Sequence, residues 1–218
     1  MVFLQGLSPT SYRYIKTFLD APTFKKKPQD HSDDPGKKYT LDCEADGNPA
    51  PTYAWFRNGN ENQMLHDASS YTITLGDDTV GLYECRVTVK GYKEIRAQAT
   101  VYQYGPPRVL SSSSGTVSVR RGADAVLTCD TFAVPVPDND VVWRYREMII
   151  SANDQYSINN VKKEDGSVKV GVVSTLTVRD VGEPDFGDYV CSVDNGHGEN
   201  SHNVHLQRIG MVQQMSNL

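Results

Sequence analysis

Four cysteines are the side chains in this sequence with the clearest chemistry. A thiol is either oxidised to a disulfide or, as a thiolate, binds a metal such as zinc. Zinc sites use closely spaced cysteine pairs, and the sequence holds no such pair, so the spacing favours disulfides. Each half of the chain carries two of the cysteines together with one tryptophan and one tyrosine. In order, the groups are Cys43, Trp55, Tyr83 and Cys85, then Cys129, Trp143, Tyr189 and Cys191.

Short β-strands are the elements that would position these residues. Apolar and polar residues alternate from Tyr39 to Ala45, which predicts a half-buried strand that carries Cys43. The tyrosine two residues before each second cysteine shares its strand face, because strand side chains alternate with period two. The first strand of the chain would carry Pro28, in an edge position where the missing N–H costs no ladder bond. The long polar stretch from Met148 to Gly171 predicts mobile loops.

The order and spacing of the two groups are typical of the immunoglobulin sandwich. The first cysteine precedes the tryptophan by 12 residues in one group and by 14 in the other. In that fold a disulfide joins strands B and F, the tryptophan packs against it, and the tyrosine bonds to backbone at a corner. We therefore predict an all-β fold with two tandem immunoglobulin-like β-sandwiches. The bonds would be Cys43–Cys85 and Cys129–Cys191, with Trp55, Tyr83, Trp143 and Tyr189 as structural core residues.

One position departs from the usual pattern of strand F. Thr79 stands two residues before Gly81, where an aspartate is common, so the salt bridge of that aspartate is in question in the first domain.

The predicted domains follow from the motif positions. Residues 1–20 are an N-terminal extension or the end of a preceding domain, and residues 21–104 are the first immunoglobulin-like domain. Residues 105–209 are the second domain, and residues 210–218 form a polar tail. A short linker containing Pro106 and Pro107 joins the domains. Prolines fix their own backbone torsion and restrict the preceding residue, so we expect an end-to-end arrangement with limited bending.

Charge and hydropathy exclude several classes of function. The net charge is −5, and residues 21–104 hold 10 basic and 12 acidic side chains while residues 105–218 hold 10 and 14. Neither half is basic enough to bind nucleic acid. No run of 18 apolar residues spans a membrane, and no secretory signal peptide is visible. Because the cytosol reduces disulfides, we interpret the chain as a fragment of a longer extracellular or cell-surface protein, attached to membrane only through segments absent from it.

The sequence predicts no enzyme, cofactor or metal site. None of the local signatures of nucleophilic, zinc or phosphate chemistry is present. His197, His202 and His205 form the one histidine cluster, but His202 and His205 would point to opposite faces of a strand, which disfavours shared metal ligation. Surface recognition remains. The Asn48–Pro51 turn and the turn at Tyr92 would lie at opposite ends or edges of the first sandwich and are candidate contacts, although ordinary exposed loops are the simpler interpretation.

Longer runs of residues resemble one family of immunoglobulin proteins. The run from Gly81 to Tyr102, followed by Gly105-Pro-Pro, resembles the end of the fourth domain of the irre cell-recognition family, the kin-of-irre and roughest proteins related to nephrin. Val141-Val-Trp, Ser174-Thr-Leu-Thr-Val and Asp185-Phe-Gly-Asp-Tyr-Val-Cys are similar to the fifth domain. The resemblance covers about residues 21–208.

The resemblance implies a single-pass adhesion receptor that binds kin on opposing cells, chiefly through an outermost domain that this chain lacks. The implied partners are cell-surface immunoglobulin-superfamily proteins, bound homophilically or heterophilically. The implied function is non-catalytic protein binding and spacing. Two alternatives stay open: the ligand-binding ectodomain of a growth-factor-type receptor and an intracellular muscle-filament module.

Overall fold

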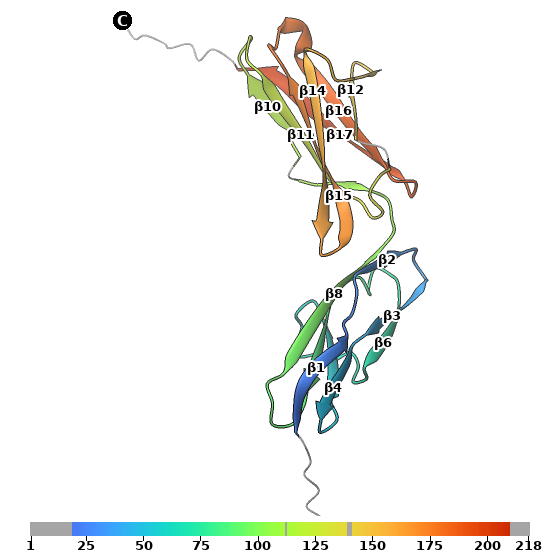
Figure 1. The fold of residues 1–218 in the computed structure, drawn as a ribbon. Coiled ribbons are helices and arrows are strands. Elements are labelled where there is room, and N and C mark those ends of the chain that lie inside the picture. The colour runs from blue at the N-terminus through green and yellow to red at the C-terminus, as the bar shows by residue number, and fades with distance from the viewer. Residues whose placement is uncertain (1–18, 112, 139–140, 210–218) are drawn as a thin grey trace, which may run out of the picture.

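The computed structural model describes residues 19–111, 113–138 and 141–209. Nearly all of the regular structure is β-strand, arranged as two sandwiches that follow one another along the chain (Figure 1). The predicted all-β fold with two tandem immunoglobulin-like sandwiches is therefore confirmed. The extension predicted before residue 19 and the polar tail predicted after residue 209 lie outside the described residues.

The first sandwich contains eight strands. One sheet has the order β2-β8-β7-β5, and the other layer consists of the pairs β1-β4 and β3-β6, which meet at Cys43. The strands are β1 (Asp20–Lys26), β2 (His31–Asp33), β3 (Lys38–Asp42), β4 (Glu44–Asn48), β5 (Thr52–Arg57), β6 (Ser70–Thr74), β7 (Gly81–Thr88) and β8 (Ile95–Gln103).

The first strand does not run through Pro28 as predicted. β1 ends at Lys26 and pairs with β4, whereas β2 pairs in parallel with β8 in the opposite sheet. Pro28 is buried in the short segment between β1 and β2. Because proline has no N–H to give to a ladder, this position suits the point where the chain leaves one sheet for the other.

The second sandwich has a larger pair of sheets, with orders β10-β17-β16-β12-β13 and β14-β15-β11-β9. Its elements are β9 (Arg108–Val109), β10 (Thr116–Val119), β11 (Ala125–Phe132), β12 (Val142–Tyr145), β13 (Met148–Ile149), β14 (Tyr156–Asp165), β15 (Val168–Val178), the 3₁₀ turn η1 (Glu183–Asp185), β16 (Gly187–Asp194) and β17 (Glu199–Arg208).

The prediction of loops across Met148–Gly171 is wrong. This stretch contains β13, all of β14 and the start of β15, and β14 with β15 forms a long antiparallel hairpin. β14 is an edge strand with only one neighbour, so its outward positions are free to be polar. Only the inward residues Tyr156 and Ile158 pack against the core, which is too few to give a clear apolar alternation. The tip of this hairpin points toward the first domain (Figure 1).

Candidate functional site: the disulfide cores and the domain joint

A disulfide crosses between the two sheets in each sandwich. Cys43, between β3 and β4, is bonded to Cys85 on β7, with 6.5 Å between their Cα atoms. Cys129 on β11 is bonded to Cys191 on β16, with 6.4 Å between their Cα atoms. All four residues are fully buried, and the described residues hold no free cysteine. All four cysteines are thus bonded as disulfides inside the two cores.

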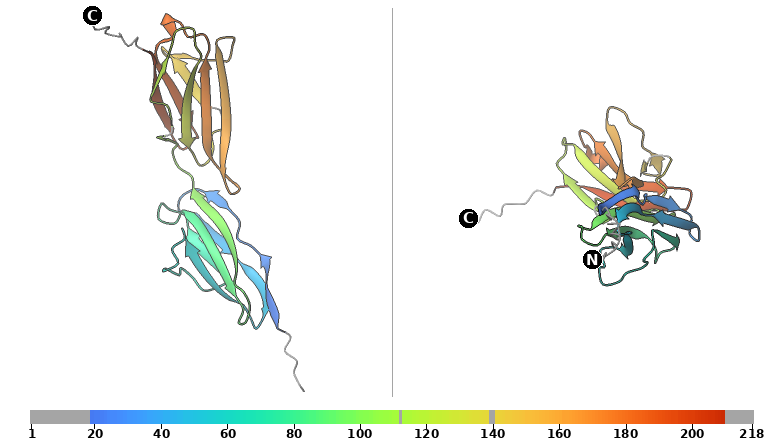
Figure 2. Two further views of the ribbon diagram at one scale, coloured as in Figure 1. Left: turned by 90° about the vertical axis from the view of Figure 1, so that its left-hand side faces the viewer. Right: turned by 60° about the horizontal axis from the view of Figure 1, so that its bottom comes forward.

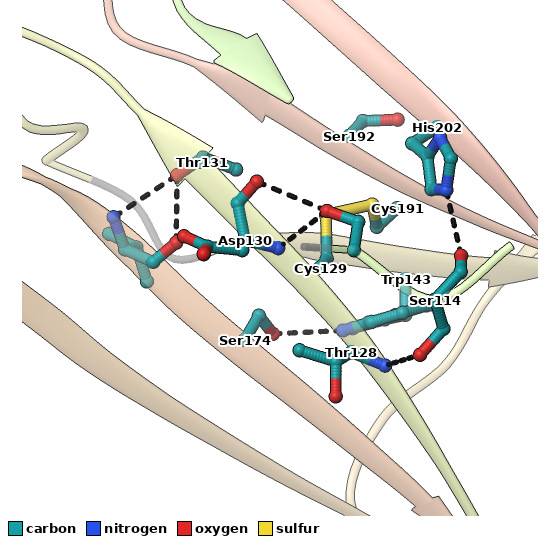
Figure 3. The surroundings of a disulfide bond; sticks show 12 residues. Ser114, Thr128, Cys129, Asp130, Thr131, Trp143, Ser174, Cys191, Ser192 and His202 are labelled. Atoms are coloured by element: carbon teal, nitrogen blue, oxygen red, sulfur yellow. Dashed lines mark hydrogen bonds between the residues drawn. A yellow bond between two sulfur atoms is a disulfide. The ribbon is translucent and has the colours of Figure 1, made fainter. Parts of the chain in front are cut away.

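Each disulfide lies in a core that also contains the fully buried tryptophan of its motif, Trp55 or Trp143. Each indole N–H is paired: Trp55 Nε1 donates to the carbonyl of Ala68 at 2.9 Å, and Trp143 Nε1 donates to Ser174 Oγ at 2.9 Å. Figure 3 shows Trp143 and Ser174 beside the Cys129–Cys191 bond. A buried indole N–H without a partner would be costly, so these bonds fix the orientation of the ring.

Polar side chains around the second disulfide also tie neighbouring strands together (Figure 3). Thr131 Oγ1 donates to the carbonyl of Val172 at 2.8 Å and accepts from the N–H of Val172 at 3.1 Å. A nitrogen of the His202 ring lies 2.8 Å from the carbonyl oxygen of Ser114. His205 Nδ1 instead lies 2.7 Å from Asp188 Oδ1, within hydrogen-bond distance, and the described residues contain no group of side chains suited to a metal ion.

The tyrosine of each motif closes a corner through its hydroxyl. Tyr83 donates to the carbonyl of Thr79 at 2.5 Å, and Tyr189 donates to the carbonyl of Asp185 at 2.9 Å. Burial raises the pKa of both phenols, so the hydroxyls stay protonated and able to donate.

An aspartate two residues before the strand F glycine commonly forms a salt bridge. Among the described residues, neither domain contains that salt bridge. In the first domain the Arg57 guanidinium donates to the backbone carbonyl of Asp78. In the second domain the Asp185 carboxylate accepts from the N–H of Gly182 at 2.7 Å and from Gln155 at 2.9 Å. Hydrogen bonds to uncharged groups thus take the place of an ion pair at these corners.

A second set of contacts lies where the two domains meet, and we call it the domain joint. Its apolar part is a small cluster of buried valines with three partly buried aromatic rings. Tyr102 and Tyr104 come from the end of the first domain and its linker, whereas the other members come from the second domain. The rings of Tyr102 and Phe132 pack with their centroids 5.8 Å apart. The full cluster is Tyr102, Tyr104, Phe132, Val134, Val168 and Val170.

The polar part of the joint centres on Asp30 of the first domain. Its carboxylate accepts from the N–H of Thr100 at 2.6 Å, within its own domain. It also accepts from the N–H of Ser167 at 2.6 Å and from Ser167 Oγ at 2.9 Å, across the joint. Burial by itself raises the pKa of Asp30, but these three hydrogen bonds to the charged form outweigh it and hold the pKa below its ordinary value of 3.8.

Further hydrogen bonds fasten the linker to the second domain. The hydroxyl of Tyr102 donates to the Asp165 carboxylate at 2.6 Å, and burial together with this contact raises the pKa of Tyr102 to about 12. The N–H of Gly105 donates to the carbonyl of Val134 at 2.8 Å, and Asn195 Nδ2 donates to the carbonyl of Gly105 at 2.8 Å. The backbone of the linker is therefore bonded from two sides, and the two sandwiches stand end to end (Figure 2).

Gly166 makes the close approach of the two domains possible. It has φ +60°, a left-handed conformation that disfavours other residues, in the turn between β14 and β15. A Cβ atom at this position would clash with the Asp30 carboxylate. Sequence reasoning missed Gly166, Ser167 and Asp30, although the Asp165-Gly166 pair is a recognised hairpin signal that marks the turn.

The two predicted surface turns of the first domain lie at the same end, which corrects the expected opposite ends. Thr52, just after the Asn48–Pro51 turn, pairs with Thr88, just before the turn that holds Tyr92. Thr52 Oγ1 also donates to the carbonyl of Thr88 at 3.3 Å. Antiparallel pairing of β5 with β7 brings these two connections together, at the end of the domain away from the joint.

The family of the chain follows from its comparison with known proteins. A family model described as "Immunoglobulin domain" matches residues 21–88 and 106–195. The chain belongs to the immunoglobulin domain family. Both matched ranges contain a complete cysteine, tryptophan, tyrosine and cysteine group, so the family assignment and the geometry of the two cores agree.

Curated relatives agree with the predicted resemblance to the irre proteins. The Irregular chiasm C-roughest protein of Drosophila melanogaster is 31% identical over 187 residues, which cover 86% of this chain and 24% of that protein. Kin of IRRE-like protein 3 of Mus musculus is 25% identical over 192 residues, which cover 87% of this chain and 24% of that protein. Neural cell adhesion molecule L1 of Mus musculus is 28% identical over 87% of this chain and 15% of its own length. The chain thus spans about a quarter or less of these relatives.

Solved structures share the fold. A chain from the complex of Dpr2 Ig1-Ig2 with DIP-Theta Ig1-Ig3 superimposes with a TM-score of 0.61 at 23% identity, covering 88% of this chain and 66% of that one. The titin tandem A164-A165 gives a TM-score of 0.52 at 18% identity, covering 88% of this chain and all of that one. At such identities the likeness shows the fold alone.

The first prediction concerns the disulfide of the first domain. Replacing both Cys43 and Cys85 with alanine should lower the free energy of unfolding of that domain by about 4 kcal/mol, because the unfolded chain regains the entropy of an open loop of about 43 residues. Urea titration followed by tryptophan fluorescence measures the change. The second domain, with its own bond, is the internal control, and an equal loss in both domains would contradict the prediction.

The second prediction concerns the domain joint. Gly166→Ala should displace the Asp30 carboxylate and widen the distribution of distances between the domains, measured by small-angle X-ray scattering on the secreted chain. Gly36→Ala is the matched control, because Gly36 also has a positive φ (+83°) but a Cβ atom added there would have no neighbouring atom within 4 Å. If both variants scatter like the parent, the joint does not hold the domains together.

The third prediction concerns pH. Because hydrogen bonds lower the pKa of Asp30 below 3.8, its contribution to the joint is complete above that pH and is lost as the pH falls through the lowered pKa. Scattering profiles should therefore be constant from about pH 7 to about pH 4 and change below it. Asp30→Asn should remove this transition, and an identical transition in the variant would assign it to other groups.

Proposed function

We propose that this chain is a non-catalytic segment of an extracellular cell-adhesion receptor, in which the two immunoglobulin domains form a semi-rigid spacer that also binds proteins. The domain joint is the observation that carries this proposal. A two-domain segment sets a defined distance only if its linker resists bending. Here Asp30, the linker backbone and an apolar cluster all connect the domains.

The two buried disulfides support the extracellular part of the proposal. Thiols of the cytosol are kept reduced, whereas both pairs in this chain are bonded in the centre of a core. The relatives include one protein named as a neural cell adhesion molecule. Within the irre-like proteins, we assign the chain to the fourth and fifth domains of a single-pass receptor. None of the described residues forms a helix long and apolar enough to cross a bilayer.

An intracellular filament module is the competing function, because the titin tandem shares this fold and the fold alone does not separate the two functions. The two functions differ in the state of the cysteines. Titration of free thiols on the folded protein, with peptide mapping of the bonded pairs, separates them. An extracellular segment has Cys43 bonded to Cys85 and Cys129 bonded to Cys191, whereas a filament module has four free thiols.

The fourth prediction tests the spacer role in cells. The full receptor that carries this segment is expressed in non-adherent cells, and aggregation is measured together with the distance between apposed membranes by electron microscopy. Deletion of residues 21–208 should shorten that distance by the length of two domains and weaken aggregation.

Replacement of the segment by an unrelated pair of immunoglobulin domains of equal length, with a comparable joint, is the control and should restore the distance. Unchanged aggregation and unchanged spacing after the deletion would refute the spacer role.

A further inference from the structure

Two asparagines in this sequence are followed directly by glycine, namely Asn58 before Gly59 and Asn195 before Gly196. In such a pair the backbone nitrogen of the glycine can attack the side-chain amide carbon of the asparagine, because glycine has no side chain to hinder the approach. The bond to the amide nitrogen breaks, ammonia leaves and a cyclic succinimide forms. Water then opens the ring and leaves an aspartate or an isoaspartate. The amide is thus exchanged for a carboxylate with water as the only co-reactant.

Asn195 lies at the domain joint, in the turn between β16 and β17. Its Nδ2 donates to the carbonyl of Gly105 in the linker at 2.8 Å and to the carbonyl of Pro135 at 3.1 Å. These acceptors are 90 and 60 residues away in the chain. Because both partners are carbonyl oxygens, only a donor suits this position. The side-chain amide of Asn195 therefore ties the linker to the second domain.

The turn that carries Asn195 also packs against the linker. The rings of His197 and Tyr104 lie with their centroids 5.4 Å apart. A Cβ atom on Gly198 would lie 2.9 Å from Pro106 Cβ, which is closer than such atoms pack. The length and position of this turn therefore determine how closely it holds the linker.

The fold holds the reacting groups of Asn195 away from each other. Its Oδ1 accepts from the N–H of His197 at 3.1 Å, and the attacking nitrogen of Gly196 donates to Asp194 Oδ1 at 2.8 Å. Attack requires that these bonds and the two bonds from Nδ2 open together. Asn58 is different, because it is exposed and its Nδ2 has no hydrogen-bond partner in the part of the chain that the structure describes. The same chemistry is therefore hindered at one pair and much less hindered at the other.

We propose that Asn195 is a site of spontaneous deamidation that is closed while the domain joint is intact, and that its product holds the joint open. A carboxylate at this position cannot donate, and it would face the two carbonyl oxygens that accept from the amide. Isoaspartate also adds a methylene carbon to the backbone path, which lengthens the turn and displaces His197 and Gly198 from the linker. A transient opening of the joint thus becomes permanent.

This modification goes beyond the proposed function, because it makes the stiffness of the two-domain segment depend on the age of the molecule. It rests on the contacts of the joint and not on adhesion.

The fifth prediction compares the two Asn-Gly pairs in the secreted chain, incubated at mildly alkaline pH and digested at intervals for mass spectrometry. In the native chain Asn195 should deamidate at least about tenfold more slowly than Asn58, because its hydrogen bonds must open first. In urea the two rates should agree to within about threefold, since no fold protects either pair. Gly166→Ala, which disturbs the joint, should raise the rate at Asn195 at least about threefold and leave the rate at Asn58 unchanged.

Asn195→Asp tests the effect of the product. Small-angle X-ray scattering on freshly prepared protein should give a wider distribution of distances between the domains than in the parent. Asn58→Asp is the matched control, because it makes the same change of charge in the other Asn-Gly pair and should scatter like the parent. Circular dichroism of each variant separates a loosened joint from a lost fold.

Three results would each overturn the proposal. The first is an equal rate at Asn195 in the native chain and in urea. The second is a rate at Asn195 that Gly166→Ala does not raise. The third is an Asn195→Asp variant that folds and scatters like the parent.

Discussion

The contact of a disulfide with a buried tryptophan between two sheets is the constraint on which each domain depends. A domain of about 100 residues buries only a modest core, and the chain entropy it must overcome is of similar size to the hydrophobic gain. The disulfide limits the unfolded chain, while Trp55 or Trp143 fills the largest volume between the sheets. In both cores the indole N–H and the corner tyrosine are hydrogen-bonded around this centre, and in the second core the hydroxyls of Ser174 and Thr131 are bonded there as well.

The domain joint constrains the arrangement of the two domains, as the disulfide core constrains the fold of each one. A linker with two prolines restricts its own torsions, but it does not prevent rotation about the bonds on either side. The Asp30 carboxylate and the valine cluster provide the remaining constraint, and the long β14-β15 hairpin supplies the surface that they contact. The hairpin that sequence reasoning assigned to loops is thus the element that connects the second domain to the first.

The resemblance to the irre proteins agrees with the relatives found, and the two strand F motifs predicted both sandwiches. Such predictions succeed because cysteine, tryptophan and tyrosine at this fixed spacing fit few folds other than the immunoglobulin sandwich. The prediction failed over residues 148–171, because an edge strand with one solvent face and a charged outer end has the composition of a loop. It also failed at Pro28, where the strand changes sheet, since a local pattern does not reveal which sheet a segment joins.

The sequence by itself determined the fold class, the repetition of the domain and the chemistry of its cysteines, because these depend on residue types at short and regular spacing. Only the tertiary structure decided which surfaces meet. Asp30 and Ser167 are 137 residues apart in the chain. Contacts of this kind depend on how the sheets and domains pack, and that information is spread over the whole chain rather than held in any one motif.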